Sequence, residues 1–170
     1  MQIKVFNCPD KNFKPIVERA ASFFAKELIP NTRIRNRCFT RIRFDGKLEE
    51  YGYASIEDYN TRNQPRDFLI EVHPGIGSRA ILSTIAHEMV HVKQYIEGEL
   101  NEEMSYWKGK RVNSDKMEYW TSPWEIEAHG IEIGLITKFA SSECLWDVLE
   151  GFSDPSVPIV STPIKWKRKK

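Results

Sequence analysis

Residues 78–98 restrict the fold of this chain more than any other segment, because they combine a long helical pattern with two histidines one turn apart. Ser78 is a favourable N-cap residue, and Gly98 is typical of the position just after a helix. The pattern therefore predicts a helix from Ser78 to about Glu97. Its apolar residues fall on one face that a core must cover, namely Leu82, Ile85, Met89, Val92 and Ile96.

The same helix carries the pattern His87-Glu88-x-x-His91 away from its apolar face. Residues four positions apart lie on one side of a helix, so both imidazoles can bind one cation. Zinc lowers the pKa of a bound water and polarises a carbonyl group, and Glu88 is placed to take the proton from that water without binding the metal itself. We predict a zinc site with Glu88 as its general base. The competing interpretation is a helix whose histidines are ordinary surface residues.

A hydrolytic zinc site needs a third protein ligand and an open fourth position. The segment PWEIEAH, residues 123–129, offers Glu125 and Glu127 at the start of a helix predicted over residues 123–140. These two glutamates lie about 200° apart around a helix, so both cannot face one ion. Glu125 also has a purely structural interpretation, because Ser122 followed three residues later by a glutamate forms a capping box.

The stretches IAHEMVHVKQY and PWEIEAHG resemble the compact HExxH zinc peptidases of the gluzincin type, and they are similar to small phage-type and SprT-like metallopeptidases. The resemblance covers residues 80–95 and 119–133. In these families a second helix supplies a glutamate that binds the metal. The resemblance therefore implies that Zn²⁺ is held by His87, His91 and Glu125, and that the substrate is a peptide or a protein.

One position departs from the family pattern. His129 stands where the family usually has aspartate or asparagine, four residues after the ligating glutamate. In the family this residue orients a metal ligand. Three roles are open to His129: orienting a ligand through a ring N–H, binding the metal, or binding the oxyanion. The oxyanion needs a donor besides zinc, and the candidates are Tyr95, Tyr119 and His129.

The rest of the chain predicts a small sheet. Strands are expected at residues 2–7, 33–44, 49–56 and 67–72, and a short hairpin within residues 105–112. A first helix is expected from Phe13 to the stop at Pro30, and Asp45-Gly46 is a strong hairpin signal. The predicted fold class is α+β and zincin-like: a small, mostly antiparallel sheet packs on the active-site helix, and a further helix closes the metal site. One domain is expected over residues 1–153, followed by an irregular basic tail over residues 154–170.

Two features suggest surfaces for larger partners. The segment RIRNRCFTRIRF alternates basic and apolar residues, which predicts a strand with one basic face. The arginines of that face are Arg33, Arg35, Arg37, Arg41 and Arg43. With the basic tail, this face either makes a weak nucleic-acid contact or is simply a solvated edge. The strand at residues 67–72 is either an edge that pairs with an extended peptide substrate or an interior strand.

The overall composition fits an intracellular protein. A net charge of +1 gives the whole molecule no strong attraction to nucleic acid or to membranes. Cys8, Cys38 and Cys144 are widely spaced, which favours three reduced thiols over a disulfide framework or a thiolate zinc site. No apolar stretch reaches the roughly 20 residues of a membrane span, and the N-terminus lacks a signal-peptide pattern. We expect a cytoplasmic protein that binds no membrane.

These observations predict a zinc-dependent hydrolase, most simply a metallopeptidase that cleaves peptide bonds with a zinc-activated water. Hydrolysis of a non-peptide amide would use the same centre. A different class of function is a non-catalytic, zincin-like binding module that docks to a protein or to nucleic acid. The presence of Glu88 argues against the module, because a scaffold needs no base beside its ligands, whereas the histidine at position 129 argues mildly for it.

Overall fold

The computed structural model describes residues 1–145, and the irregular tail predicted at residues 154–170 lies outside this part of the chain. The described residues form an α+β structure, which confirms the α+β part of the predicted fold class, with short 3-10 turns at Ser114–Lys116 and Tyr119–Thr121. In chain order the other elements are β1 Gln2–Phe6, α1 Lys14–Leu28, α2 Thr32–Arg35, β2 Phe39–Phe44, β3 Gly52–Tyr59, β4 Pro65–Val72, α3 Ser78–Glu97, β5 Tyr106–Trp107, β6 Lys110–Arg111 and α4 Pro123–Glu143.

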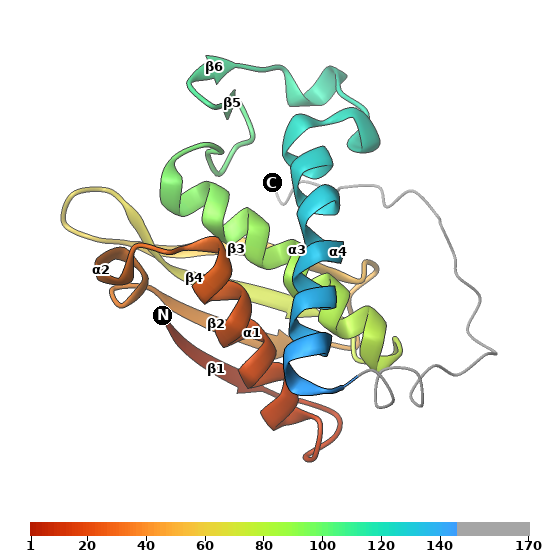
Figure 1. Cartoon of the computed structure of the whole chain (residues 1–170). Helices are drawn as coiled ribbons and strands as arrows, with labels where there is room; N and C mark the ends of the chain where they lie inside the picture. The colour runs from red at the N-terminus through yellow and green to blue at the C-terminus, as the bar shows by residue number, and fades with distance from the viewer. Residues whose placement is uncertain (146–170) are drawn as a thin grey trace.

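The main sheet has the strand order β1-β2-β4-β3 (Figure 1). β1, β2 and β4 run parallel, and β3 at the edge runs antiparallel to β4. The sheet is therefore mixed, and the prediction of a mostly antiparallel sheet is wrong. That prediction depended on a hairpin at Asp45-Gly46, but β4 lies between β2 and β3. The backbone N–H of Asp45 donates to the carbonyl of Val72, at the end of β4, because the chain passes over that end on its way to the edge.

The predicted strand over residues 33–44 is too long. Residues Thr32–Arg35 form a helical turn instead, because the Asn31 side chain accepts hydrogen bonds from the backbone N–H groups of Arg33 and Ile34 and caps that turn. The predicted row of five arginines is consequently wrong, since only Arg41 and Arg43 lie in β2.

The two arginines of β2 are paired within the sheet. A guanidinium nitrogen of Arg41 lies 3.0 Å from a carboxylate oxygen of Asp67 and 3.5 Å from one of Glu57. Arg43 forms an ion pair with Glu71. Each basic side chain therefore faces an acidic one on β3 or β4, and this part of the sheet surface is a mixed-charge ladder and not a basic stripe.

β4 is the inner strand next to the edge. The strand predicted at residues 67–72 is confirmed, and of its two interpretations the interior strand holds. Phe68, Ile70 and Val72 are fully buried, as expected for a strand with neighbours on both sides and helices over one face. The edge strands of the main sheet are β1 and β3, and β3 is the edge strand that packs against α3.

α1 and α3 cover the same face of the main sheet, and α4 packs against both of them (Figure 1). The predicted helices are confirmed to within a few residues at each end. α3 begins at Ser78, so its N-cap is Gly77, one residue before the predicted cap. The helix ends at Glu97, and the following Gly98 has a left-handed φ of +69°. Phe24 of α1 and Phe139 of α4 pack edge to face with ring centroids 5.8 Å apart, so the two helices share one core.

Within residues 1–145, no helix combines the length and the apolar character needed to cross a membrane.

Gly52, the first residue of β3, lies against α3 where there is no room for a side chain. A Cβ atom at this position would lie 2.5 Å from the Thr84 methyl carbon and 2.7 Å from the backbone oxygen of Glu71. We predict that Gly52→Ala lowers the free energy of unfolding by about 1–3 kcal/mol, because the backbone of β3 must move away from the helix. Urea unfolding measures the change. Gly46→Ala is the matched control, since its nearest neighbour is 3.8 Å away, and equal stabilities of the two variants would contradict this packing.

Candidate metal centre

The two histidines of the motif meet the start of α4 in the interior of the protein. His87 and His91 lie one turn apart on α3, and Glu125 lies in the first turn of α4. His87 Nε2 is 3.1 Å from His91 Nε2 and 3.1 Å from Glu125 Oε2, and His91 Nε2 is 3.5 Å from Glu125 Oε1. All three residues are buried, so the interpretation of ordinary surface histidines is wrong.

The donor atoms of this trio have the spacing of a tetrahedral metal site. Zinc bonds of about 2.0–2.1 Å at tetrahedral angles place neighbouring donor atoms about 3.3 Å apart. The three measured separations are 3.1, 3.1 and 3.5 Å. Two imidazole nitrogens and one carboxylate oxygen also suit zinc chemically. The trio therefore fits a zinc ion in both distance and donor type.

Glu125 does not act as a helix cap. The Ser122 hydroxyl donates to the carbonyl of Glu118, and the backbone N–H of Ser122 donates to the carbonyl of Tyr119, so neither half of the predicted capping box forms. Glu125 is 1% exposed and its carboxylate faces the two histidines. Glu127 points to another part of the interface, where it accepts a hydrogen bond from Gln94. Of the two glutamates considered, the geometry groups Glu125 with the histidines.

The residue that orients His87 is Glu132, a role the sequence had suggested for position 129. Glu132 Oε2 lies 2.8 Å from His87 Nδ1. A carboxylate only accepts hydrogen bonds, so Nδ1 of His87 carries a hydrogen, and Nε2 is the ring nitrogen on which a metal ion would replace the proton shared with Glu125. Glu132 follows Glu125 by seven residues, which is two helical turns on the same face, and this spacing is the signal by which the pair is recognisable in the sequence.

His129 lies beside the trio and not in it. Its Nδ1 is 3.6 Å from Glu132 Oε2, and its Nε2 is 3.4 Å from the Tyr119 hydroxyl oxygen. Its ring stacks on Trp120, with centroids 4.9 Å apart. His87, His129 and Glu132 form a second group of potential ligands, but that group competes for the same Glu132 oxygen that accepts the hydrogen bond from His87.

Of the three residues proposed as oxyanion donors, Tyr119 and His129 lie together next to Glu125. Burial raises the pKa of Tyr119, and the charge of Glu125 and a hydrogen bond to it raise the pKa further, so the hydroxyl stays protonated and able to donate. Tyr95 is also protonated, because burial, followed by the charge of Glu88, raises its pKa. Tyr95 is 5% exposed and belongs to the core cluster.

Buried charges in the trio shift the pKa values of its members. Burial acts to lower the pKa of His87, but hydrogen bonds to Glu125 and Glu132 outweigh it and raise the pKa to about 10. Burial acts to raise the pKa of Glu125, yet its bonds to His87 and His91 hold that pKa well below the usual range. The carboxylates thus stabilise a positive charge at the imidazoles, and a metal ion would compete with the proton that supplies this charge.

Glu88 is buried beside the trio without a complete set of hydrogen bonds. It is 4% exposed, and its Oε2 atom has no hydrogen-bond partner within residues 1–145. Burial raises its pKa, while the neighbouring charges of His87 and His91 act in the opposite direction. Glu125 Oε1 likewise has no hydrogen-bond partner in this part of the chain. Two buried carboxylate oxygens without a hydrogen-bond partner among the described residues, beside two imidazoles, fit a centre that would hold a cation.

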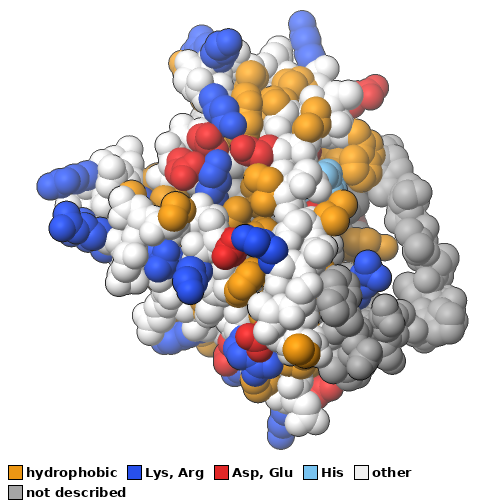
Figure 2. Space-filling model, in the orientation of Figure 1, with side chains coloured by type: hydrophobic (Ala, Val, Ile, Leu, Met, Phe, Trp, Pro, Cys, Tyr) orange, Lys and Arg blue, Asp and Glu red, His pale blue; other side chains and the backbone are white. Residues whose placement is uncertain are grey.

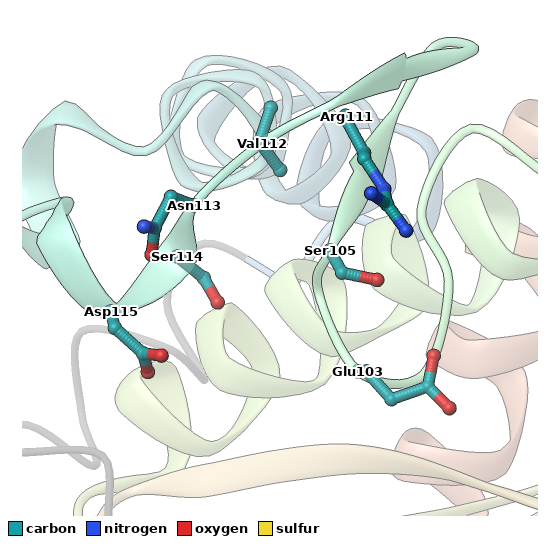
Figure 3. A pocket seen from close by; sticks show the side chains of 7 residues that line it. All are labelled: Glu103, Ser105, Arg111, Val112, Asn113, Ser114 and Asp115. Atoms are coloured by element: carbon teal, nitrogen blue, oxygen red, sulfur yellow. The ribbon is translucent and has the colours of Figure 1, made fainter.

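A separate pocket lies next to the β5-β6 hairpin (Figure 3). It is lined by Glu103, Ser105, Arg111, Val112, Asn113, Ser114 and Asp115. The residues predicted to bind metal or to act as base are all absent from its lining, so the metal centre and this pocket are distinct.

Comparisons with protein-family models, curated proteins and solved structures found no match for this chain. The resemblance to HExxH peptidases accordingly remains an inference from the motif residues themselves.

The pKa of His87 makes the stability of the metal-free protein depend on pH. The pKa of His87 is 6.5 in the unfolded chain and about 10 in the folded chain, so the folded state binds more protons between these pH values. We predict that the stabilisation is complete below about pH 6.5 and is lost as the pH rises through about 10. Urea unfolding of chelator-treated protein across this window measures it. The zinc-loaded protein is the control, and a constant unfolding free energy without metal would contradict the pairing of His87.

Glu132 and His129 can be separated by their effects on metal affinity. We predict that Glu132→Leu weakens zinc binding by about 10- to 100-fold, because His87 loses the acceptor that fixes its ring. His129→Leu should have a smaller effect, since His129 contacts His87 only through a tilted ring contact, with centroids 4.5 Å apart. Competition with a chromophoric chelator measures both affinities. A larger loss for His129→Leu would return the orienting role to position 129.

Proposed function

We propose that this chain is a zinc-dependent hydrolase with a zincin-like fold, and that it acts as a metallopeptidase. The observation that carries the proposal is the convergence of His87 Nε2, His91 Nε2 and the Glu125 carboxylate within 3.1–3.5 Å of one another, with the buried base Glu88 next to them. Three protein ligands with an adjoining carboxylate are the donor set of hydrolytic zinc sites.

The chemistry follows from the positions of these residues. When bound, zinc would lower the pKa of water and polarise a substrate carbonyl. Glu88 accepts the proton from the attacking water, and its raised pKa suits it to return that proton to the leaving nitrogen. We assign the oxyanion donors to the His129 ring and to the Tyr119 hydroxyl, 3.4 Å from it, which would turn from its hydrogen bond with Glu125 to the oxyanion.

A peptide substrate also fits the arrangement of the sheet. β3 is the edge strand that packs beside α3, the helix of the motif. An extended peptide can pair with such an edge and place its carbonyl group near the helix. The sequence had suggested residues 67–72 as the edge that pairs with the substrate. Because β4 has a neighbour on each side, we assign this role to β3.

Metal content and turnover of three variants test the proposal. Purified without added metal, the wild type should carry about one zinc per chain, and Glu125→Gln should lose most of it. Glu88→Gln should keep its zinc but lose casein hydrolysis by on the order of 10²-fold or more, because only the base is removed. Glu143→Gln, at the far end of α4, is the matched control and should resemble the wild type.

The outcomes separate the alternatives. Zinc binding that survives in Glu125→Gln would show that another residue is the third ligand. Zinc binding without any hydrolysis by the wild type, for protein and small amide substrates alike, would favour the non-catalytic binding module. Absence of zinc from the wild type, even after zinc is supplied, would refute the metal centre.

A further inference from the structure

Gln94 is a fully buried polar residue at the contact between α3 and α4, and the zinc-site motif does not account for it. It follows His91 by three residues on α3 and has 0% exposure. Its side chain forms three hydrogen bonds, one to His91 and two to α4. A buried amide is costly unless its donors and its acceptor are all satisfied, so its orientation here is informative.

The partners of Gln94 on α4 fix the orientation of its amide group. Gln94 Nε2 lies 3.1 Å from the backbone oxygen of Trp124 and 2.8 Å from Glu127 Oε2. A carbonyl and a carboxylate only accept hydrogen bonds, so the NH₂ group must face them. Gln94 Oε1 must then face His91, whose Nδ1 lies 2.9 Å away.

The orientation of Gln94 in turn fixes the tautomer of His91. Since Gln94 Oε1 is an acceptor, His91 Nδ1 must carry the ring hydrogen. His91 Nε2, which lies 3.5 Å from Glu125 Oε1 and 3.1 Å from His87 Nε2, is then the ring nitrogen left to bind a metal ion. Glu132 does the same for His87, so each ligand histidine has its own orienting partner, a carboxylate in one case and an amide in the other.

We propose that Gln94 is a positioning residue, which holds His91 in the metal-binding tautomer, and that Glu127 holds Gln94. This inference rests on the proposed zinc site and extends it. Gln94 touches neither the metal position nor a substrate; it acts through His91. Hydrogen-bond partners of this kind typically change metal affinity by about 10- to 100-fold when they are removed.

The chain of contacts continues to the surface hairpin. Glu127 Oε1 lies 3.1 Å from the Lys108 ammonium and 3.7 Å from that of Lys93. Lys108 and Gly109 form the turn between β5 and β6, both with positive φ, as a tight hairpin turn requires. Lys108 is 46% exposed, so this outer ion pair is screened by solvent and should matter much less than the buried amide.

Zinc affinity, measured by competition with a chromophoric chelator, tests the proposal in variants that separate the two roles of Gln94, which are to accept a hydrogen bond from His91 and to donate to α4. Gln94→Leu keeps the volume but removes the acceptor, and should weaken zinc binding by about 10- to 100-fold. Gln94→Glu keeps an acceptor for His91 but puts a second carboxylate oxygen where the NH₂ group faced Glu127. The two carboxylates repel each other, so this variant should also bind zinc more weakly. Adding Glu127→Gln to Gln94→Glu supplies a donor from the other side, and should restore most of the affinity. Lys108→Ala is the exposed control and should change affinity by less than about threefold.

A spectroscopic readout distinguishes positioning from simple structural damage. The ¹⁵N chemical shifts of His91 in zinc-loaded protein should report a hydrogen on Nδ1 and the metal on Nε2 in the wild type and in the Gln94→Glu/Glu127→Gln pair. If Gln94→Leu does not fold, the single and paired glutamate variants still decide the question. Unchanged affinity in Gln94→Leu, or no recovery in the pair, would overturn the role of Gln94 while leaving the zinc site intact. A wild type that binds no zinc would overturn both proposals.

Discussion

The burial of one carboxylate between α3 and α4 is the constraint on which the rest of the centre depends. Glu125 is 1% exposed, and a carboxylate in the protein interior is unfavourable unless a cation faces it. His87 and His91 supply that charge as imidazolium groups or as ligands of a metal ion, and both arrangements keep α4 against α3. The packing of the two helices is therefore linked to the chemistry between them, because a metal ion held by the trio would stabilise the folded chain directly.

The polar groups around the trio show how such a centre is held in a core. Glu132 and Gln94 each accept the Nδ1 hydrogen of one histidine, and Gln94 is itself held by acceptors on α4. These bonds leave the two Nε2 atoms 3.1 Å apart, a separation at which they share a proton or would both bind one cation. Buried hydrophobic side chains pack around this polar interior, and on the face shown in Figure 2 several hydrophobic side chains lie beside a partly visible histidine.

Prediction from the sequence succeeded where the signal is local and failed for the pairing of strands that are distant in the sequence. The bounds of α3 and α4 follow from helical periodicity, Gly98 and Pro123, all of which act within a few residues. The Asp45-Gly46 signal and the alternating arginines are equally local, yet they were overridden: β4 inserted beside β2, and the Asn31 side chain capped a helical turn where a strand was expected. Strand order depends on which apolar faces bury one another, and no short pattern records that choice.

The sequence by itself determined which face of α3 carries the two imidazoles, because the spacing of His87 and His91 and the helical repeat place them together whatever the rest of the fold does. It also placed Glu125 one helical face away from Glu127, but it could not separate a metal ligand from a helix cap. Tertiary structure excluded the helix cap and brought Glu125 to the two histidines, and it selected Glu132 and Gln94 as the partners of the two rings. The reason is physical: a hydrogen bond between residues 45 positions apart exists only after the helices have packed.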